Sequence, residues 1–350
     1  MTEGRWRRID TSPAVEHDLL VIDLDGVVYV GPDAVPGSVE ALTSARQAGT
    51  AWAFATNNAS RTPDEVAAHL RELGLPVDPD EVVTSSQAAA VLVRERLGAG
   101  ARVLAVGGRG VAEACRRAGL EIVDTADDAP AAVVQGYGRH VAWTDLAEAT
   151  VAVRAGALWI ATNTDLTIPT PRGVMPGNGS LVAAVAAAAG VQPLVAGKPQ
   201  PHLFTTAARR TGARRPLVVG DRLDTDIAGA AAAGQASLLV LTGVTRPDDL
   251  LRADAGHRPD LVAVDLAGLH DAHPVAVRHG DSWTCGRARA SWQDDRLVGS
   301  GADGDDGALD LLRAGCAALW ERTDAGDVTG PEIAVAPGPT ARWAGLGSIG

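Results

Sequence analysis

Val21-Ile22-Asp23-Leu24-Asp25-Gly26-Val27-Val28-Tyr29 is the stretch that decides the fold of this chain. The apolar run at 19–22 ends in two carboxylates and a glycine, which predicts a buried strand of a parallel sheet. Ligands of open α/β sheets bind beyond the carboxyl ends of the strands, where Asp23 and Asp25 would lie on one face. Two such acids would repel each other, and a hard cation such as Mg²⁺ would relieve that repulsion. These residues alone leave a solvated turn at a strand end as an open alternative.

The composition excludes several classes of protein. A chain of 350 residues allows two or three domains with sizeable cores. Its formal net charge of -12 argues against nonspecific nucleic-acid binding, so an anionic ligand would need local cations. The apolar runs are too short to span a bilayer, and residues 1–18 are charged and unlike a secretory signal. Cys115, Cys285 and Cys316 lack metal-ligand spacing and are expected to be reduced thiols. We therefore expect a cytoplasmic protein with no nucleic-acid or membrane partner.

Strand and helix patterns alternate along the chain. Strands are predicted over 19–22, 51–55, 102–106, 121–123, 131–135, 158–161, 216–219, 236–241 and 260–262, with a small hairpin at 27–30. Helices are predicted over 36–45, 63–73, 87–97, 111–118, 144–155, 181–191, 202–210 and 308–322. This alternation predicts an α/β fold with a doubly wound parallel sheet.

The rhythm restarts near residue 85, which suggests an insertion. We predict a core formed by 1–84 and 195–269, an inserted α/β domain at 85–194 and a small α+β appendage at 270–350. The proline- and glycine-rich stretch after Asp165 is predicted to be an ordered but irregular loop. The appendage contains Trp283, Trp292, Trp320 and Trp343.

Four polar signals follow strands of the predicted core. They are Asp23 with Asp25, Thr56-Asn57-Asn58, Lys198, and Asp221 with Asp226. Together they supply what phosphoryl transfer needs: a nucleophile, an acid/base, phosphate donors, a fixed positive charge and metal ligands.

The motifs that contain these residues, DLDGVVY, ATNNAS, GKPQP and GDRLDTDI, resemble in sequence and order the four motifs of the haloacid-dehalogenase-like (HAD) phosphohydrolases. The insert resembles the large α/β cap of the NagD-like, phosphoglycolate and pyridoxal phosphatase branch, including ATNTD at 161–165 and MPGNGS at 175–180. Within that branch the chain looks most like the actinobacterial glycerol-3-phosphate phosphatases. The resemblance covers residues 18–269 and implies a Rossmann-like HAD core with an inserted cap.

The resemblance implies a role for each matching acid. Asp23 would be the nucleophile that forms an aspartyl-phosphate, and Asp25 would be the general acid and base. Mg²⁺ would be held by the Asp23 carboxylate, the Asp25 backbone carbonyl and Asp221. Asp226 would orient metal-bound waters or Lys198 from behind these groups.

The phosphate-binding residues follow from the same resemblance. Thr56 and the amides of Asn57 and Asn58 would bind phosphate oxygens, and Lys198 would offset the charge of phosphate and nucleophile. Thr56 could instead cap the helix that begins at Pro63, and Lys198 could be a solvated loop lysine.

Other motifs have plainer explanations. Asp226 and Asp224 could cap the following helix, which is the favoured interpretation for Asp224. Gly107-Gly108-Arg109-Gly110 lacks the full glycine spacing of a dinucleotide site. Residues 296–301 resemble the pyrophosphate loop of acetyltransferases, and the appendage resembles a truncated fragment of that fold. It is expected to serve packing or dimerisation rather than acetyl transfer.

The leading functional hypothesis is a Mg²⁺-dependent phosphatase of small phosphorylated metabolites, with glycerol 3-phosphate as the expected substrate. Cap residues would select the substrate, with Ile168 and Arg172 nearest the expected mouth. Alternatives are phosphoglycolate, pyridoxal phosphate or a nucleoside monophosphate as substrate, and a phosphotransferase. A non-catalytic HAD scaffold that binds a partner through its appendage is the alternative from another class. A homodimer is possible.

Overall fold

The structure is a computed structural model that describes residues 6–170, 172–293, 295–301 and 304–326. Trp343 and Asp303 of the appendage lie outside the described residues. By their contacts the residues form two compact units, Met1–Trp52 with Thr211–Gly350, and Ala53–Arg210. The division at 84, 194 and 269 stays a prediction.

The first unit combines an N-terminal and a C-terminal segment of the chain. Its core elements are α1 (Pro13–Glu16), β1 (Leu19–Ile22), β2 (Tyr29–Val30), β3 (Asp33–Ala34), α2 (Ser38–Gln47), β13 (Pro216–Gly220), η3 (Leu223–Ile227), α9 (Ala228–Ala233), β14 (Ala236–Val240), α10 (Pro247–Leu251), β15 (Leu261–Ala263) and η4 (Leu266–Leu269). The remaining elements are β16 (Val277–His279), β17 (Ser282–Cys285), β18 (Ala288–Gln293), β19 (Arg296–Ser300) and α11 (Gly304–Asp324).

A parallel sheet with the strand order β15-β14-β13-β1 forms the centre of this unit. All four residues of β1 are buried, and the register places Ile22 opposite Val219. The predicted strand at 19–22 is therefore confirmed, and its buried apolar run is what a strand inside a parallel sheet requires. Asp23 follows directly, and its N–H donates to the Val219 carbonyl at 2.8 Å.

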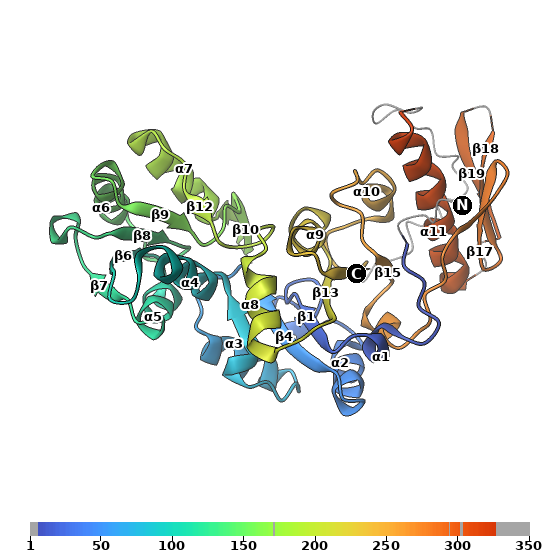
Figure 1. Ribbon diagram of the computed structural model, residues 1–350, viewed down its shortest axis with the longest axis horizontal. Helices are drawn as coiled ribbons and strands as arrows, with labels where there is room; N and C mark the ends of the chain where they lie inside the picture. The colour runs from blue at the N-terminus through green and yellow to red at the C-terminus, as the bar shows by residue number, and fades with distance from the viewer. Residues whose placement is uncertain (1–5, 171, 294, 302–303, 327–350) are drawn as a thin grey trace. The chain divides into compact units, whose positions relative to one another are not determined.

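The C-terminal strands β16 to β19 form an antiparallel sheet against which α11 packs (Figure 1). One apolar cluster contains Trp283 and Trp320 of this region together with Leu239 and Val262 of the parallel sheet. Arg313 of α11 is buried and donates to the Val262 carbonyl at 2.8 Å. The described part of the appendage thus shares a core with the parallel sheet. The stretch that resembles the pyrophosphate loop of acetyltransferases is mostly strand β19.

The second unit is continuous in sequence. It contains the last four residues of β4 (Ala51–Thr56), α3 (Pro63–Glu72), η1 (Pro79–Glu81), β5 (Val82–Thr84), α4 (Ser85–Leu97), β6 (Arg102–Val106), α5 (Arg109–Arg117), β7 (Glu121–Val123), η2 (Ala126–Asp128), β8 (Ala132–Gln135), α6 (Trp143–Arg154), β9 (Leu158–Ala161), β10 (Thr167–Thr170), β11 (Gly173–Pro176), α7 (Asn178–Ala189), β12 (Leu194–Val195) and nearly all of α8 (His202–Thr211).

The cap sheet has the strand order β12-β9-β8-β6-β7 and is parallel throughout. Figure 1 shows α6 and α7 over one face and α4 and α5 over the other. Val133, Trp159 and Val182 are among the residues of the core under α6 and α7. Parallel sheets covered by helices on both faces are what the strand-helix alternation predicted.

The segment after Asp165 corrects one prediction. It was expected to be an irregular loop, but β10 and β11 pair as an antiparallel hairpin, with Ile168 opposite Met175. The prolines obscured the pattern, because proline cannot donate within a ladder and normally argues against a strand. A two-stranded ribbon tolerates them, since each strand has an edge that needs no donor.

Each of the cysteines Cys115, Cys285 and Cys316 is a free thiol in a buried position. Burial raises the pKa of Cys115 and of Cys285 to about 12. Among the described helices, none has the length and apolar character needed to cross a membrane.

Candidate active site

Three carboxylates gather at the ends of β1 and β13 in the first unit. Asp23, Asp221 and Asp226 each offer a carboxylate oxygen, and these oxygens lie within 4.8 Å of one another. Asp221 and Asp226 are buried, and Asp23 is half-buried. The sequence predicted Asp221 as a metal ligand and Asp226 only as a supporting residue, whereas the structure places the Asp226 carboxylate within the same cluster.

Close backbone contacts hold Asp221 in place. Its Oδ2 accepts a hydrogen bond of 2.6 Å from the Val244 N–H. A Cβ added to Gly243 would lie 2.0 Å from the same oxygen, and one added to Gly26 would lie 2.7 Å from it. Glycine is therefore needed at both positions for the carboxylate to stay where it is.

Asp25 begins the turn that leads into the β2–β3 hairpin. The Gly26 N–H donates to the Tyr29 carbonyl at 2.9 Å, and Gly26 has a φ of +83°. The Thr242 hydroxyl donates to the Gly26 carbonyl at 2.6 Å. Asp25 itself is exposed.

The two acids that follow Arg222 have different partners. Asp226 accepts from the Arg222 N–H at 3.1 Å. Asp224 forms a two-point ion pair with the Arg222 guanidinium, at 3.0 and 2.7 Å, and that pairing lowers the pKa of the Asp224 carboxyl. Asp224 therefore forms an ion pair with Arg222 instead of the expected helix cap.

The predicted phosphate-binding residues lie together at the end of β4 in the second unit. Thr56 is buried, and its hydroxyl accepts from the Asn58 N–H at 3.0 Å. The Asn58 side chain accepts from both the N–H and the hydroxyl of Ser60. The helix α3 is capped by Thr62, so Thr56 does not have the capping role that the sequence left open.

Lys198 belongs to the same group of residues. It is only 4% exposed, which rules out the solvated loop lysine. Its Nζ lies 5.9 Å from the centroid of the Phe204 ring. Its backbone is hydrogen-bonded to the side chain of Asn57, at 2.8 Å through the N–H and 3.3 Å through the carbonyl.

The two cap residues expected near the mouth lie on the β10–β11 hairpin. Ile168 is a half-buried residue of β10, and Arg172 is exposed in the turn before β11. They are thus brought onto one short element, six to ten residues after the buried Thr162.

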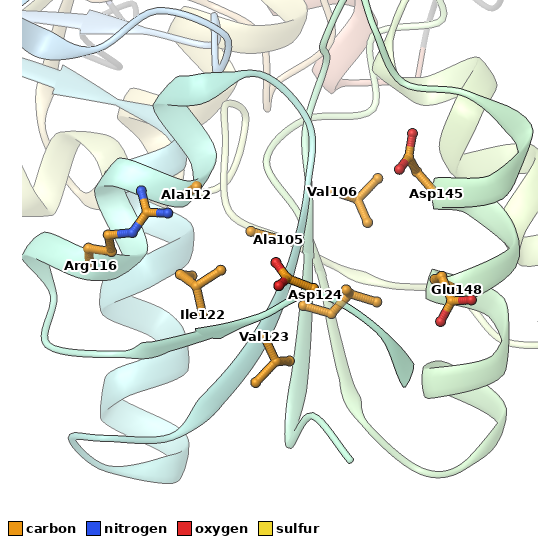
Figure 2. Close-up of a pocket in the computed structure, with 10 residues that line it drawn as sticks. Ala105, Val106, Ala112, Arg116, Ile122, Val123, Asp124, Asp145 and Glu148 are labelled. Atoms are coloured by element: carbon orange, nitrogen blue, oxygen red, sulfur yellow. The ribbon is translucent and has the colours of Figure 1, made fainter. Parts of the chain in front are cut away.

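Figure 2 shows a cavity of about 290 Å³ in the cap, formed at β6, β7, α5 and α6. Arg116, Asp124, Asp145 and Glu148 surround an apolar floor. Glu148 accepts from the Ala126 N–H at 2.7 Å, and Asp145 accepts from the Ala142 N–H at the same distance. None of the predicted site residues lines this cavity. Two of its acids, Asp145 and Glu148, already accept hydrogen bonds from backbone N–H groups.

Sequence reasoning did not connect three polar residues with Asn57: Ser85 and Asn163 donate to its carbonyl oxygen, and Asn178 donates to the Asn163 carbonyl. All three are buried. The phrases ATNTD and MPGNGS were recognised as resembling the cap, but a side-chain hydrogen bond between distant segments leaves no periodic signal in a sequence.

Comparison of this chain with known proteins identifies its family. The haloacid dehalogenase-like hydrolase family matches residues 20–121, and a HAD-hydrolase-like family matches residues 195–269. A D-glycerol 3-phosphate phosphatase of Mycobacterium tuberculosis is 48% identical over 89% of this chain and 88% of its own length. The chain belongs to the haloacid dehalogenase-like hydrolase family.

Other relatives are phosphatases as well. An acid sugar phosphatase of Staphylococcus aureus is 37% identical over 67% of this chain and 90% of its own length. The crystal structure of the glycerol phosphate phosphatase of M. tuberculosis in complex with magnesium has a TM-score of 0.85 and 43% identity, with 95% of this chain and 99% of that chain covered. A 4-nitrophenylphosphatase of Thermotoga maritima has a TM-score of 0.68 and 33% identity, with 74% and 98% covered. The predicted Rossmann-like HAD fold with a cap and the phosphoric monoester hydrolase class are confirmed.

Proposed function

We propose that this HAD hydrolase is a Mg²⁺-dependent phosphatase of glycerol 3-phosphate. The cluster of Asp23, Asp221 and Asp226 is the observation that supports the proposal most strongly. It brings the proposed nucleophile, Asp23, next to the acids expected to bind or support the metal ion. The 48% identity to a D-glycerol 3-phosphate phosphatase supports the substrate, and the relative crystallised with magnesium supports the metal.

The acid cluster fits Mg²⁺ by its chemistry. Its donors are carboxylate oxygens, which hard divalent cations prefer, and they converge within 4.8 Å in a largely buried setting. Asp23, Asp221 and the Asp25 carbonyl would hold the ion, with Asp226 as a supporting or additional ligand. Bound there, Mg²⁺ would offset the negative charge of the phosphate group.

Asp23 and Asp25 share the proposed chemistry. A carboxylate oxygen of Asp23 attacks phosphorus, the bond from phosphorus to the alcohol oxygen breaks, and the protonated Asp25 carboxyl gives its proton to the leaving alkoxide. Water then attacks the aspartyl-phosphate, Asp25 takes a proton from that water, and phosphate leaves with the Asp23 carboxylate restored. Both steps balance without another reactant.

The second unit supplies the proposed phosphate-binding groups. Thr56 with the backbone amides of Asn57 and Asn58 would bind the non-bridging oxygens, and Lys198 would offset their charge. The burial of Thr56 and Lys198 supports these roles, because a charged or polar group in a dry setting interacts more strongly with an anion.

Substrate choice is assigned to the cap hairpin, where Ile168 and Arg172 lie. Arg172 would meet a polar or anionic end of the substrate, and Ile168 would limit its size. Phosphoglycolate, pyridoxal phosphate and nucleoside monophosphates are the alternative substrates. We place the enzyme in a reducing compartment, the cytoplasm, since its three cysteines are buried free thiols. A homodimer stays a prediction.

The test is phosphate release from glycerol 3-phosphate and these alternatives, with Mg²⁺ and with a chelator. Asp23→Asn should lower release at least about a thousandfold, because the nucleophile is lost. Asp33→Asn, which removes an exposed carboxylate from the neighbouring hairpin, should stay within about twofold of the original chain.

Each other outcome points to a different function. Release from another substrate would replace glycerol 3-phosphate while keeping the chemistry. Transfer of phosphate to an added alcohol in place of water would identify a phosphotransferase. A folded chain that releases phosphate from nothing in the panel would favour the scaffold hypothesis.

A further inference from the structure

The side chain of Asn57 holds the backbone of Lys198 through two hydrogen bonds. The Lys198 N–H donates to Asn57 Oδ1 at 2.8 Å, and Asn57 Nδ2 donates to the Lys198 carbonyl at 3.3 Å. A primary amide that bonds both polar groups of one residue fixes the position and the orientation of that backbone. The Asn57 side chain is thereby engaged with Lys198.

This contact is closely packed. A Cβ at Gly197 would lie 2.6 Å from Asn57 Oδ1 and 2.3 Å from the Thr162 carbonyl oxygen. Only glycine at position 197 allows the chain to pass so near both groups. The position of Lys198 therefore depends on where Asn57 and the end of β9 lie.

Asn57 is itself held by two side chains that bond to its carbonyl oxygen. Ser85 donates to it through its hydroxyl and Asn163 through Nδ2, each at 2.8 Å. Ser85 is fully buried, and Asn163 is 5% exposed. Hydrogen bonds in such a dry setting restrict motion more than exposed ones do.

Each donor is fixed in its turn. Ser85 is the first residue of α4, whose start is set by a capping box between Thr84 and Gln87. Asn163 accepts from the Asp165 N–H at 3.2 Å through Oδ1, and its carbonyl accepts from Asn178 Nδ2 at 2.7 Å. One donor thus belongs to the first turn of α4 and the other to the cap segment that leads to the hairpin.

We propose that Ser85 and Asn163 are positioning residues for phosphate-ester hydrolysis, acting through Asn57 to fix Lys198. The inference rests on the proposed role of Lys198 in offsetting charge at the phosphate. A charge placed in advance stabilises a transition state only where it lies at the correct distance, and small misplacements reduce the rate steeply. Asn163 makes the cap a part of that arrangement, beyond any role in substrate choice.

Ser85 and Ser86 form a matched pair for the test. Both are fully buried in the first turn of α4, and both donate to a carbonyl of the same loop, Ser85 to Asn57 and Ser86 to Ala59 at 2.9 Å. Ser85→Ala should lower kcat for Mg²⁺-dependent phosphate release about tenfold and leave KM within about twofold. Ser86→Ala should lose similar thermal stability with kcat unchanged.

Asn163→Asp tests the second donor. The substitution keeps the size of the side chain and the oxygen that accepts from Asp165, and it replaces the group that donates to Asn57. We expect kcat to fall at least as far as in Ser85→Ala, with both variants folded by circular dichroism. Should Asn163→Asp fail to fold, the serine pair decides.

A Lys198→Ala background shows whether the effect passes through the lysine. In that background, Ser85→Ala should lower kcat no further, because residues that act as a unit are not additive. An activated aryl phosphate as the substrate helps to keep the remaining rate measurable. If the Lys198→Ala rate is below detection, the comparison of Ser85→Ala with Ser86→Ala decides alone.

The possible failures are distinct. Equal kcat values for Ser85→Ala and Ser86→Ala, or a full Ser85 effect without Lys198, would overturn the positioning roles and leave the phosphatase intact. Absence of phosphate release from the original chain would instead overturn the proposed function.

Discussion

The Asp221 carboxylate is packed so closely that two neighbouring positions have room only for glycine. Its carboxylate accepts from Val244, and Gly26 and Gly243 pack against the same oxygen. Such a residue has little freedom to reorient when a ligand binds, so under the proposed function its carboxylate would already be oriented for Mg²⁺ in the folded chain.

Gly243→Ala should weaken Mg²⁺ binding about tenfold, because the added methyl group displaces the Asp221 oxygen that lies 2.0 Å from its position. Titration calorimetry measures the affinity without reference to turnover. Gly256→Ala is the control, since the nearest atom to its Cβ is the end of a side chain at 3.4 Å. Unchanged Mg²⁺ affinity in Gly243→Ala would contradict the assignment of Asp221 as a ligand.

The positions of two of the clustered acids could be predicted from the sequence, because these residues come directly after apolar strands. Asp23 and Asp221 lie at strand ends, as the motif spacing required. The hydrogen bond between Asn57 and Lys198 could not be predicted, because 141 positions separate the two residues. From the sequence alone, the side-chain amide of Asn57 could equally have faced a ligand.

Local chemistry fixes the ends of elements. Thr62 and Glu65 form a capping box at the start of α3, and the backbone hydrogen bond from Thr62 lowers the pKa of the Glu65 carboxyl. Proline at position 63 and this box made the start of α3 predictable. The hairpin β10–β11 was missed because its prolines mask a strand pattern that only the pairing completes.

Thr62→Ala should reduce the free energy of unfolding by about 1 kcal/mol, the usual cost of losing an N-cap. Chemical denaturation measures this value. Thr150→Ala is the contrast, because the Thr150 hydroxyl bonds back to the Leu146 carbonyl within α6, where alanine is the better helix former. An equal loss in both variants would show that the cap has no special weight.

The hairpin gives a prediction for specificity. Arg172→Gln should raise KM for glycerol 3-phosphate about tenfold and leave kcat within about twofold, because a ground-state contact to the substrate is lost. Val174→Thr alters a 75% exposed side chain on the same hairpin and should change neither constant. Steady-state kinetics decide, and an unchanged KM in Arg172→Gln would remove that residue from the substrate-binding role.

At the scale of the whole molecule, the α/β class and the presence of an insert could be predicted from the strand-helix rhythm. The core that the appendage shares with the parallel sheet could not be predicted. Tryptophans in a sequence indicate burial, but they do not indicate which residues they pack against. Trp320, for example, donates to the Leu251 carbonyl at 3.2 Å and packs against Trp6.

Two buried histidines predict the pH dependence of stability. Burial is the main cause that lowers the pKa of His17 and of His273 from 6.5, and the charge of Arg313 lowers that of His273 further. Below pH 6.5 these histidines bind protons in the unfolded chain but stay neutral in the folded chain. The free energy of unfolding therefore falls as the pH drops from 6.5 toward the lowered pKa values of the folded state. Each histidine contributes a slope of up to about 1.4 kcal/mol per pH unit.

Denaturation at several pH values between 7 and 5 measures that slope. His17→Gln combined with His273→Gln should flatten it, whereas His279→Gln, at an exposed position, should leave it unchanged. An unaltered slope in the double variant would assign the acid sensitivity to other groups.

The discontinuity of the first unit has a consequence for biosynthesis. Residues 53–210 of the second unit emerge from the ribosome in one piece, so that unit can fold while the rest is still being translated. The first unit must wait, because β1 needs β13 beside it and the cluster around Val262 needs α11. The nascent chain therefore carries the β13-facing edge of β1 without its partner until residues 216–220 have been translated, and synthesis that stops before α11 leaves the core around Val262 open.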